Sequence, residues 1–181
     1  MDKTHRTELR RVFLLQNLPE SLTRSSRHLQ IFDNYIENTR LRLRSIRSPD
    51  TKAWTWILEQ RFPLEDLSQW GVSEILLDKN EHAVFEQFEG REIQKNEKIQ
   101  TNEIRKNRYF YQTGEQQFEI DLFLGELWGL ILAQIVFQTA EEMRKLEVPP
   151  FAILDVTDNE FFIGKNLVGK TFADVQTEFL K

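Results

Sequence analysis

The sequence predicts a mainly β protein (α+β): a closed antiparallel barrel of eight strands with peripheral helices. Three observations support this fold. Apolar and polar residues alternate with period two in eight segments, which charged or turn-forming stretches separate. Several segments carry charges on one face and apolar residues on the other. Only two segments have a helical pattern. Because alternating strands put one residue set inside and the other outside, eight of them can close a barrel with a polar interior.

The clearest strand is 40–44, where Arg40, Arg42 and Arg44 alternate with leucines. Alternation places all three guanidinium groups on one face of the strand. The remaining expected strands, in chain order, are 8–15, 28–36, 53–59, 72–77, 104–111, 117–122 and 130–137. In 53–59 we expect Trp54 and Trp56 to lie on the outer, packed face.

Two helices are expected outside the sheet, at 80–89 and 139–146. Asn80 is the expected N-cap of the first. The second begins with Thr139, has glutamates early and basic residues late, and ends before a Pro-Pro pair.

Length and composition limit the classes of function. The 181 residues fit one domain, 1–181, with its core at about 8–167. Lys and Arg total 24 against 29 Asp and Glu, so the net charge of −5 argues against general nucleic-acid or anionic-membrane binding. The longest apolar stretch, 127–137, has about half the ~20 residues of a membrane helix. The absence of Cys excludes thiolate chemistry and is compatible with a reducing compartment. We therefore expect a cytoplasmic protein without nucleic-acid or membrane partners.

Charges on other strands suggest that the arginine strand faces the barrel interior. An isolated arginine triplet is more simply interpreted as a solvated edge. However, Arg108 lies in the strand KNRYFY, and Glu119 and Asp121 lie two apart in FEIDLF. Charges inside a barrel are unfavourable unless they are paired or meet a charged ligand. The pattern thus favours a local anion site in an acidic chain.

Segment 118–137, FEIDLFLGELWGLILAQIVF, resembles a signature of the CYTH or triphosphate tunnel family. In that signature an acidic strand precedes G-E-L-x-G-L and A-E-[IV]-E-F. Segments 33–44, 106–111 and 154–167 resemble the early strands, the central basic strand and the C-terminal segment of the family, in the same order. The family includes class IV adenylyl cyclases, thiamine triphosphatases and inorganic triphosphatases. The resemblance implies a barrel that holds a triphosphate, with basic residues on the phosphates and acidic residues on Mg²⁺ or Mn²⁺.

Matching by residue gives the candidate site. The resemblance implies phosphate contacts from a basic set and a residual acidic or metal set. The basic set is Arg10, Arg40, Arg42, Arg44, Lys106 and Arg108, and the acidic set is Glu8, Glu119 and Asp121. Five positions depart from the family pattern. Arg10 and Val12 change the expected E-x-E-x-K, Ile57 stands where a lysine is expected, and Gln134 and Val136 replace the glutamates of A-E-x-E-F.

These departures weaken the expected metal site more than the basic one. Three of the six acidic positions are lost, whereas hard cations need several oxygen ligands. With Glu59 also facing inward, the inferred interior carries six cations and four carboxylates, a net charge of +2. Arginine favours bidentate phosphate recognition.

Three functions stay open. The first is a tunnel protein that binds a small phosphate-rich anion, such as a triphosphate, polyphosphate or nucleotide, with weakened or lost hydrolysis. The second is an active metal-dependent triphosphatase or adenylyl cyclase in which Glu8, Glu119 and Asp121 hold one metal. The third is an interaction scaffold whose interior charges pair with each other. No cofactor other than Mg²⁺ or Mn²⁺ is implied, and catalytic residues are unassigned.

Overall fold

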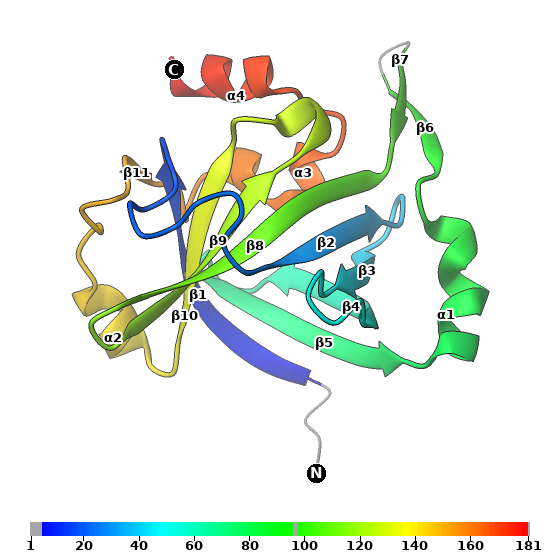
Figure 1. Ribbon diagram of the computed structural model, residues 1–181, viewed down its shortest axis with the longest axis horizontal. Coiled ribbons are helices and arrows are strands. Elements are labelled where there is room, and N and C mark those ends of the chain that lie inside the picture. Colours follow the sequence, from blue (N-terminus) through cyan, green and yellow to red (C-terminus); the bar gives the residue numbers. More distant parts are fainter. Residues whose placement is uncertain (1–4, 96–97, 181) are drawn as a thin grey trace.

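Eight strands close into an antiparallel barrel (Figure 1). The structure is a computed structural model that describes residues 5–95 and 98–180. In the order given in the next sentence, each strand pairs with the one that follows, and the last strand pairs with the first to close the barrel. The order is β1 (His5–Leu15), β10 (Ile131–Phe137), β9 (Gln116–Phe123), β8 (Glu103–Thr113), β2 (His28–Tyr35), β3 (Leu41–Arg47), β4 (Trp54–Pro63) and β5 (Gln69–Leu77).

Strand alternation separates a charged interior from an apolar outer layer. Tyr109, Phe118 and Ile120 are fully buried on the outer face of β8 and β9. They pack with Leu22 and Phe151, which lie in the connections after β1 and after α2 (Ala140–Lys145). The residues that alternate with them, such as Arg108 and Asp121, line the interior instead.

A second apolar cluster lies beneath the C-terminal segment at one end of the barrel. This segment contains β11 (Leu154–Asp155), η3 (Glu160–Phe162), α3 (Gly164–Leu167) and α4 (Phe172–Phe179). Leu167 and Val175 are fully buried there with Leu132 of β10. A Cβ on Gly164 would lie 2.0 Å from the Tyr35 hydroxyl oxygen, so the segment packs closely on β2. Figure 1 shows α4 above this end of the strands.

The structure confirms all eight expected strands with small shifts at their ends. The arginine strand begins at Leu41 rather than Arg40, and β4 continues to Pro63. The sequence did not indicate the hairpin β6 (Glu92–Lys95) and β7 (Lys98–Thr101), nor η2 (Gly125–Leu127). Trp54 and Trp56 lie on the outer face as expected, and Trp54 packs against the Phe32 and Trp56 rings although it is 44% exposed.

The first helix differs from its prediction. The helix expected at 80–89 is present but shorter: α1 spans Lys79–Phe85 and gives way to the 3₁₀ turn η1 (Glu86–Phe88). Its N-cap is Asp78, not Asn80, because the Asp78 carboxylate accepts hydrogen bonds from two backbone N–H groups of the first turn. The Thr139 cap of α2 is confirmed. Within the described part of the chain, the helices are too short or too polar to cross a membrane.

We expect Phe118→Ala to lower the free energy of unfolding by about 3–5 kcal/mol, because it leaves a cavity in a fully buried layer. The Phe118 ring packs edge-on against Phe13 and Phe151, with centroids 6.3 and 5.2 Å away. Urea unfolding measures the change. Ile75→Ala, at a position 53% exposed, is the control and should cost less than about 1 kcal/mol. Equal losses in the two variants would contradict this packing.

Candidate functional site

A cavity of about 270 Å³ lies inside the barrel, between the strands and the C-terminal segment. Among the described residues, eight cationic side chains and two carboxylates, Glu59 and Asp121, line it. The cations include all six that the sequence indicated. They are Arg10, Arg40, Arg42, Arg44, Arg61, Lys106, Arg108 and Lys165. Apolar side chains, including Trp70 and Phe62, line the rest of the wall.

Asp33 on β2 is the centre of the interior ion pairs. It is completely buried and lies between β3 and β8, which flank β2 in the sheet. The Arg44 guanidinium donates to its carboxylate at 2.6 and 2.9 Å, and Arg42 donates at 3.3 Å. Lys106 Nζ lies 3.4 Å from the same group. One buried carboxylate thus holds cations from the strands on both sides.

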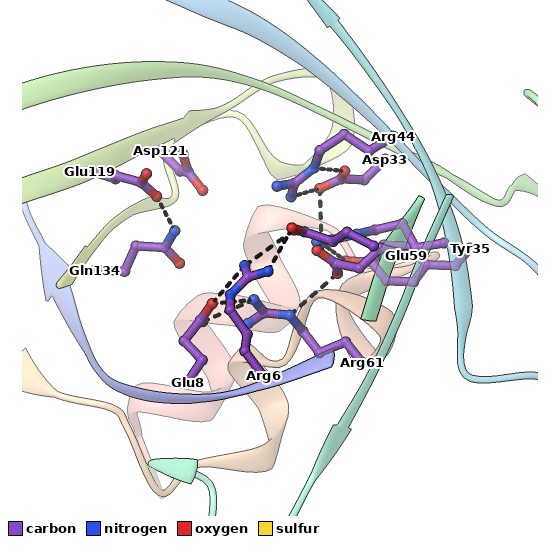
Figure 2. Close-up of polar contacts among 12 residues, drawn as sticks. Arg6, Glu8, Asp33, Tyr35, Arg44, Glu59, Arg61, Glu119, Asp121 and Gln134 are labelled. Atoms are coloured by element: carbon purple, nitrogen blue, oxygen red, sulfur yellow. Dashed lines mark hydrogen bonds and ion pairs between the residues drawn. The ribbon is translucent and has the colours of Figure 1, made fainter. Parts of the chain in front are cut away.

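The ion pairs continue from Arg42 to β4 and β1. Arg42 Nη2 lies 2.5 Å from Glu59, and Arg61 Nε lies 3.3 Å from the same carboxylate. Arg61 Nη2 then donates to both oxygens of Glu8 at 2.9 Å. Arg6 joins at the edge, 3.6 Å from Glu8 (Figure 2).

The ion pairs also continue in the other direction, through β8 to β9 and β10. Asp121 lies 2.7 Å from Lys106 Nζ and accepts from Arg108 at 2.7 and 2.8 Å. Arg108 Nη1 reaches Glu119 at 2.7 Å, and Gln134 donates to that carboxylate at 2.5 Å (Figure 2). Arg6 also pairs with Glu74 of β5 at 2.6 Å. All eight strands therefore share one connected network, which we call the charge belt.

The charge belt determines the protonation states of its members. Burial alone would raise the pKa of Glu59, but Arg42 and Arg61 outweigh it and lower that pKa to about 2. Burial likewise opposes ionisation of Asp33 and Asp121, yet the adjacent cations hold the pKa of each well below its usual value. Burial lowers the pKa of Lys106, which its two carboxylate partners oppose. The carboxylates of Asp33, Glu59 and Asp121 therefore stay ionised and paired with cations.

Arg10 is the exception inside the barrel. No carboxylate of the described residues forms an ion pair with it, and its buried Nε has no hydrogen-bond partner among them. Its guanidinium instead lies over the Trp70 ring, 4.5 Å from the ring centre. Burial, followed by repulsion from Arg61, lowers its pKa to about 9. A partly buried cation in the cavity thus lacks a carboxylate partner among the described residues.

Two further cations are at the rim of the same cavity. Arg40 is exposed and lies over the Phe62 ring, 4.4 Å from its centre. Lys165 in α3 donates to the backbone oxygen of Thr39 at 2.9 Å. Neither forms an ion pair with a carboxylate in the part of the chain described, so both are available to an entering anion.

The substituted family positions come together where β1 meets β10. In the register of these strands Arg10 pairs with Val136, and Val12 pairs with Gln134. Three of the five departures, Arg10, Val12 and Gln134, therefore line the cavity together. Val136 is half exposed and lines a separate hollow at the outer edge of β10, and Ile57 also lies outside the cavity lining.

The residues present do not fit the Mg²⁺ or Mn²⁺ that the family resemblance implies. The described residues hold no group of three or more carboxylates or histidines arranged to bind a metal ion. Glu8, Glu119 and Asp121 each already accept from an arginine. Gln134 uses its amide as a donor to Glu119. A guanidinium, an amide and an alkyl group replace the oxygen ligands that a hard cation needs.

Sequence reasoning missed four charged members of the charge belt, Arg6, Asp33, Arg61 and Glu74, and the adjacent Tyr35, whose hydroxyl accepts from Arg42 at 3.2 Å. Alternation offered a signal for three of these residues. Asp33 and Tyr35 are two apart in an expected strand, and Arg61 is two residues beyond the inward Glu59. Arg61 was missed because the expected strand ended at Glu59, whereas β4 continues to Pro63.

Comparison with solved structures supports the fold. No protein-family model and no curated protein matches the chain. Two structures of the protein NE1496 are similar, one described as a hypothetical protein and one as an inorganic triphosphatase. They are 20% and 21% identical over 91% and 90% of this chain and 99% and 95% of theirs, with TM-scores of 0.54 and 0.55. This likeness confirms the closed antiparallel barrel fold that the sequence indicated.

We expect stability to fall steeply in acid because the pKa of Glu59 lies below its ordinary value of 4.5. A group of this kind stabilises the fold above its unfolded pKa, and that contribution disappears as the pH falls through the folded pKa. The loss should therefore extend from about pH 5 to about pH 2, with about 3 kcal/mol from Glu59. Urea unfolding of the wild type and Glu59→Gln across this range measures it. The variant should show a shallower dependence on pH, and an identical slope would contradict the assignment.

Proposed function

We propose that the protein binds a phosphate-rich anion in the barrel cavity without a divalent metal, and that it hydrolyses such anions weakly or not at all. The observation that carries this proposal is the partly buried Arg10 guanidinium, which has no carboxylate partner among the described residues and lines a cavity with eight cations and two carboxylates. The similarity to a structure described as an inorganic triphosphatase favours a phosphate over other anions as the ligand.

An unpaired charge in a protein interior is unfavourable, so an anion that meets Arg10 would remove an existing cost. The Trp70 ring packs against the Arg10 guanidinium and restricts its orientation. The Arg10 side chain therefore loses less conformational entropy when a phosphate binds. Guanidinium and phosphate then form charge-assisted, bidentate hydrogen bonds. Arg40 and Lys165 would add charge at the rim.

Weak hydrolysis follows from the ligands that a metal would need. Metal ions accelerate phosphoryl transfer by polarising the phosphoryl group and positioning the attacking water. Here each remaining acid of the metal set is held by an arginine, and Arg10 adds a positive charge beside Glu8. A guanidinium can neutralise phosphate charge but cannot activate water as a metal does.

The interaction scaffold is the second candidate, because Arg42, Arg44, Lys106 and Arg108 already pair with carboxylates. In a scaffold the charge belt would be purely structural. The two proposals give opposite results for anion binding, so one titration separates them.

We expect tripolyphosphate to bind in the presence of EDTA and to raise the melting temperature by mass action. Arg10→Ala should weaken binding by about 10- to 100-fold, the value of one charge-assisted contact. Titration calorimetry at low and moderate salt measures this, and higher salt should weaken it. Arg27→Ala is the matched control, since Arg27 is exposed and pairs with Asp50 on the surface. No heat or stabilisation at millimolar ligand would favour the scaffold.

We expect turnover of tripolyphosphate, thiamine triphosphate and ATP far below the ~10 s⁻¹ typical of enzymes, with Mg²⁺ or Mn²⁺. Phosphate release assays measure it. The triple variant Arg10→Glu, Gln134→Glu, Val136→Glu places acids on two adjoining strands, so its anion binding should become metal-dependent. A wild-type rate near the typical value would show that the surviving acids suffice.

A further inference from the structure

A second hollow, of about 230 Å³, lies on the outer face of the barrel beneath α1 and η1. It is formed by the other side of the strands that carry the charge belt. Phe32, Ser45 and Trp56 point outward, whereas their chain neighbours Asp33 and Arg44 point inward. The hollow is therefore separate from the tunnel and takes no part in the proposed anion site.

A small residue between two aromatic ones creates this hollow. Phe32 pairs with Ser45 in the register of β2 and β3, and Ser45 pairs with Trp56 in that of β3 and β4. Directly paired residues point to the same face, so Ser45 forms a floor between two rings. Trp54 extends the aromatic wall: its ring is 5.8 Å from Phe32 and 6.5 Å from Trp56.

Carboxylates and one imidazole complete the lining. The Glu89 carboxylate, just after η1, accepts from the Ser45 hydroxyl at 2.7 Å. The same carboxylate lies 2.9 Å from Nε2 of His82, whose ring stacks on Trp56 with centroids 4.6 Å apart. Glu103, at the start of β8, lines the hollow from another direction. These contacts fix Glu89 at the mouth and anchor the α1–η1 segment to the sheet.

The electrostatics of the hollow are those of a cation site. No Lys or Arg of the described residues lines it. Burial raises the pKa of Glu103, Arg105 opposes this, and Glu89 adds to it. Arg105 reaches Glu103 only at 3.4 Å and is itself 54% exposed, so this pair is weak. Apart from the His82 imidazole beside Glu89, no described basic side chain lines the hollow next to these two carboxylates.

We propose that this hollow binds a small alkylammonium group, free or at the end of a lysine-type side chain. Aromatic faces within about 6 Å of a cation attract it through the ring quadrupole, and tryptophan does so best. Glu89 and Glu103 would supply the opposite charge. Quaternary and methylated ammonium groups fit this chemistry because they are weakly hydrated and need no full set of hydrogen-bond acceptors.

Tryptophan fluorescence of the full chain, titrated with choline and with its neutral isostere 3,3-dimethylbutan-1-ol, tests the proposal. Choline should give a saturable change and bind at least about 10-fold more tightly than the alcohol, because only choline carries the charge. A trimethyllysine peptide in a second arm distinguishes a protein side chain from a free ammonium as the source. Tripolyphosphate should not compete.

Glu103→Gln should weaken choline binding about 10-fold, and Trp56→Leu should weaken it at least as much. The matched controls are Glu126→Gln and Trp128→Phe, both exposed positions remote from the hollow in the fold, which should bind choline as the wild type does. Circular dichroism verifies that each variant is folded. Equal binding of choline and the alcohol, an unaffected Glu103→Gln, or no saturable change below about 100 mM would each overturn the proposal.

Discussion

The buried Asp33 carboxylate is the interaction on which the interior depends. Three cations from two different strands approach this one group, and their other contacts spread the pairing to β1 in one direction and β10 in the other. Breaking a buried pair by removing one partner is strongly destabilising, because the remaining charge stays desolvated. Removing Asp33 would leave Arg42 and Lys106 with one carboxylate each and Arg44 without an ion pair. The same carboxylate therefore holds the fold and sets the orientation of the arginines.

The charge belt also explains why the cavity is cationic although the chain is acidic. The carboxylates of the charge belt pair with the belt's own cations, so these pairs add little net positive charge to the cavity. The excess comes from Arg10, Arg40 and Lys165, whose aromatic or backbone partners leave their charge uncompensated. The proposed anion site is consequently displaced from Arg42 and Arg44 toward Arg40, the β1 wall and the C-terminal segment. The substitutions at the β1–β10 junction support the proposed function together: Gln134 and Val136 remove acids that would attract a metal, and Arg10 adds a positive charge that would attract an anion.

Alternation predicted the barrel well because side-chain direction in a strand follows from covalent geometry alone. It placed Arg42, Arg44, Lys106 and Arg108 inside correctly, and family resemblance added Arg10 and Glu8. It could not predict which charges pair, since pairing depends on register between distant strands: Arg61 and Glu8 are 53 residues apart. The end of β4 was misplaced for a related reason, because Gln60-Arg61-Phe62-Pro63 has weak strand propensity and is held by pairing with β5. The short helices α3 and α4 depend on tertiary packing against the end of the barrel, which no local sequence pattern encodes.

The two faces of β2, β3 and β4 favour ligands of opposite charge. Both preferences follow from charges that the lining side chains do not fully neutralise. Inside, arginines outnumber the carboxylates that line the cavity, so an added anion is favourable. Outside, two carboxylates face aromatic rings without a lining Lys or Arg in the described residues, so an added cation is favourable. Ser45 and Arg44 are adjacent in the chain yet belong to these two sites. A shift of β3 by one residue would exchange its two faces and destroy both sites together. The register that Asp33 fixes by pairing with Arg44 thus supports the outer hollow as well as the tunnel.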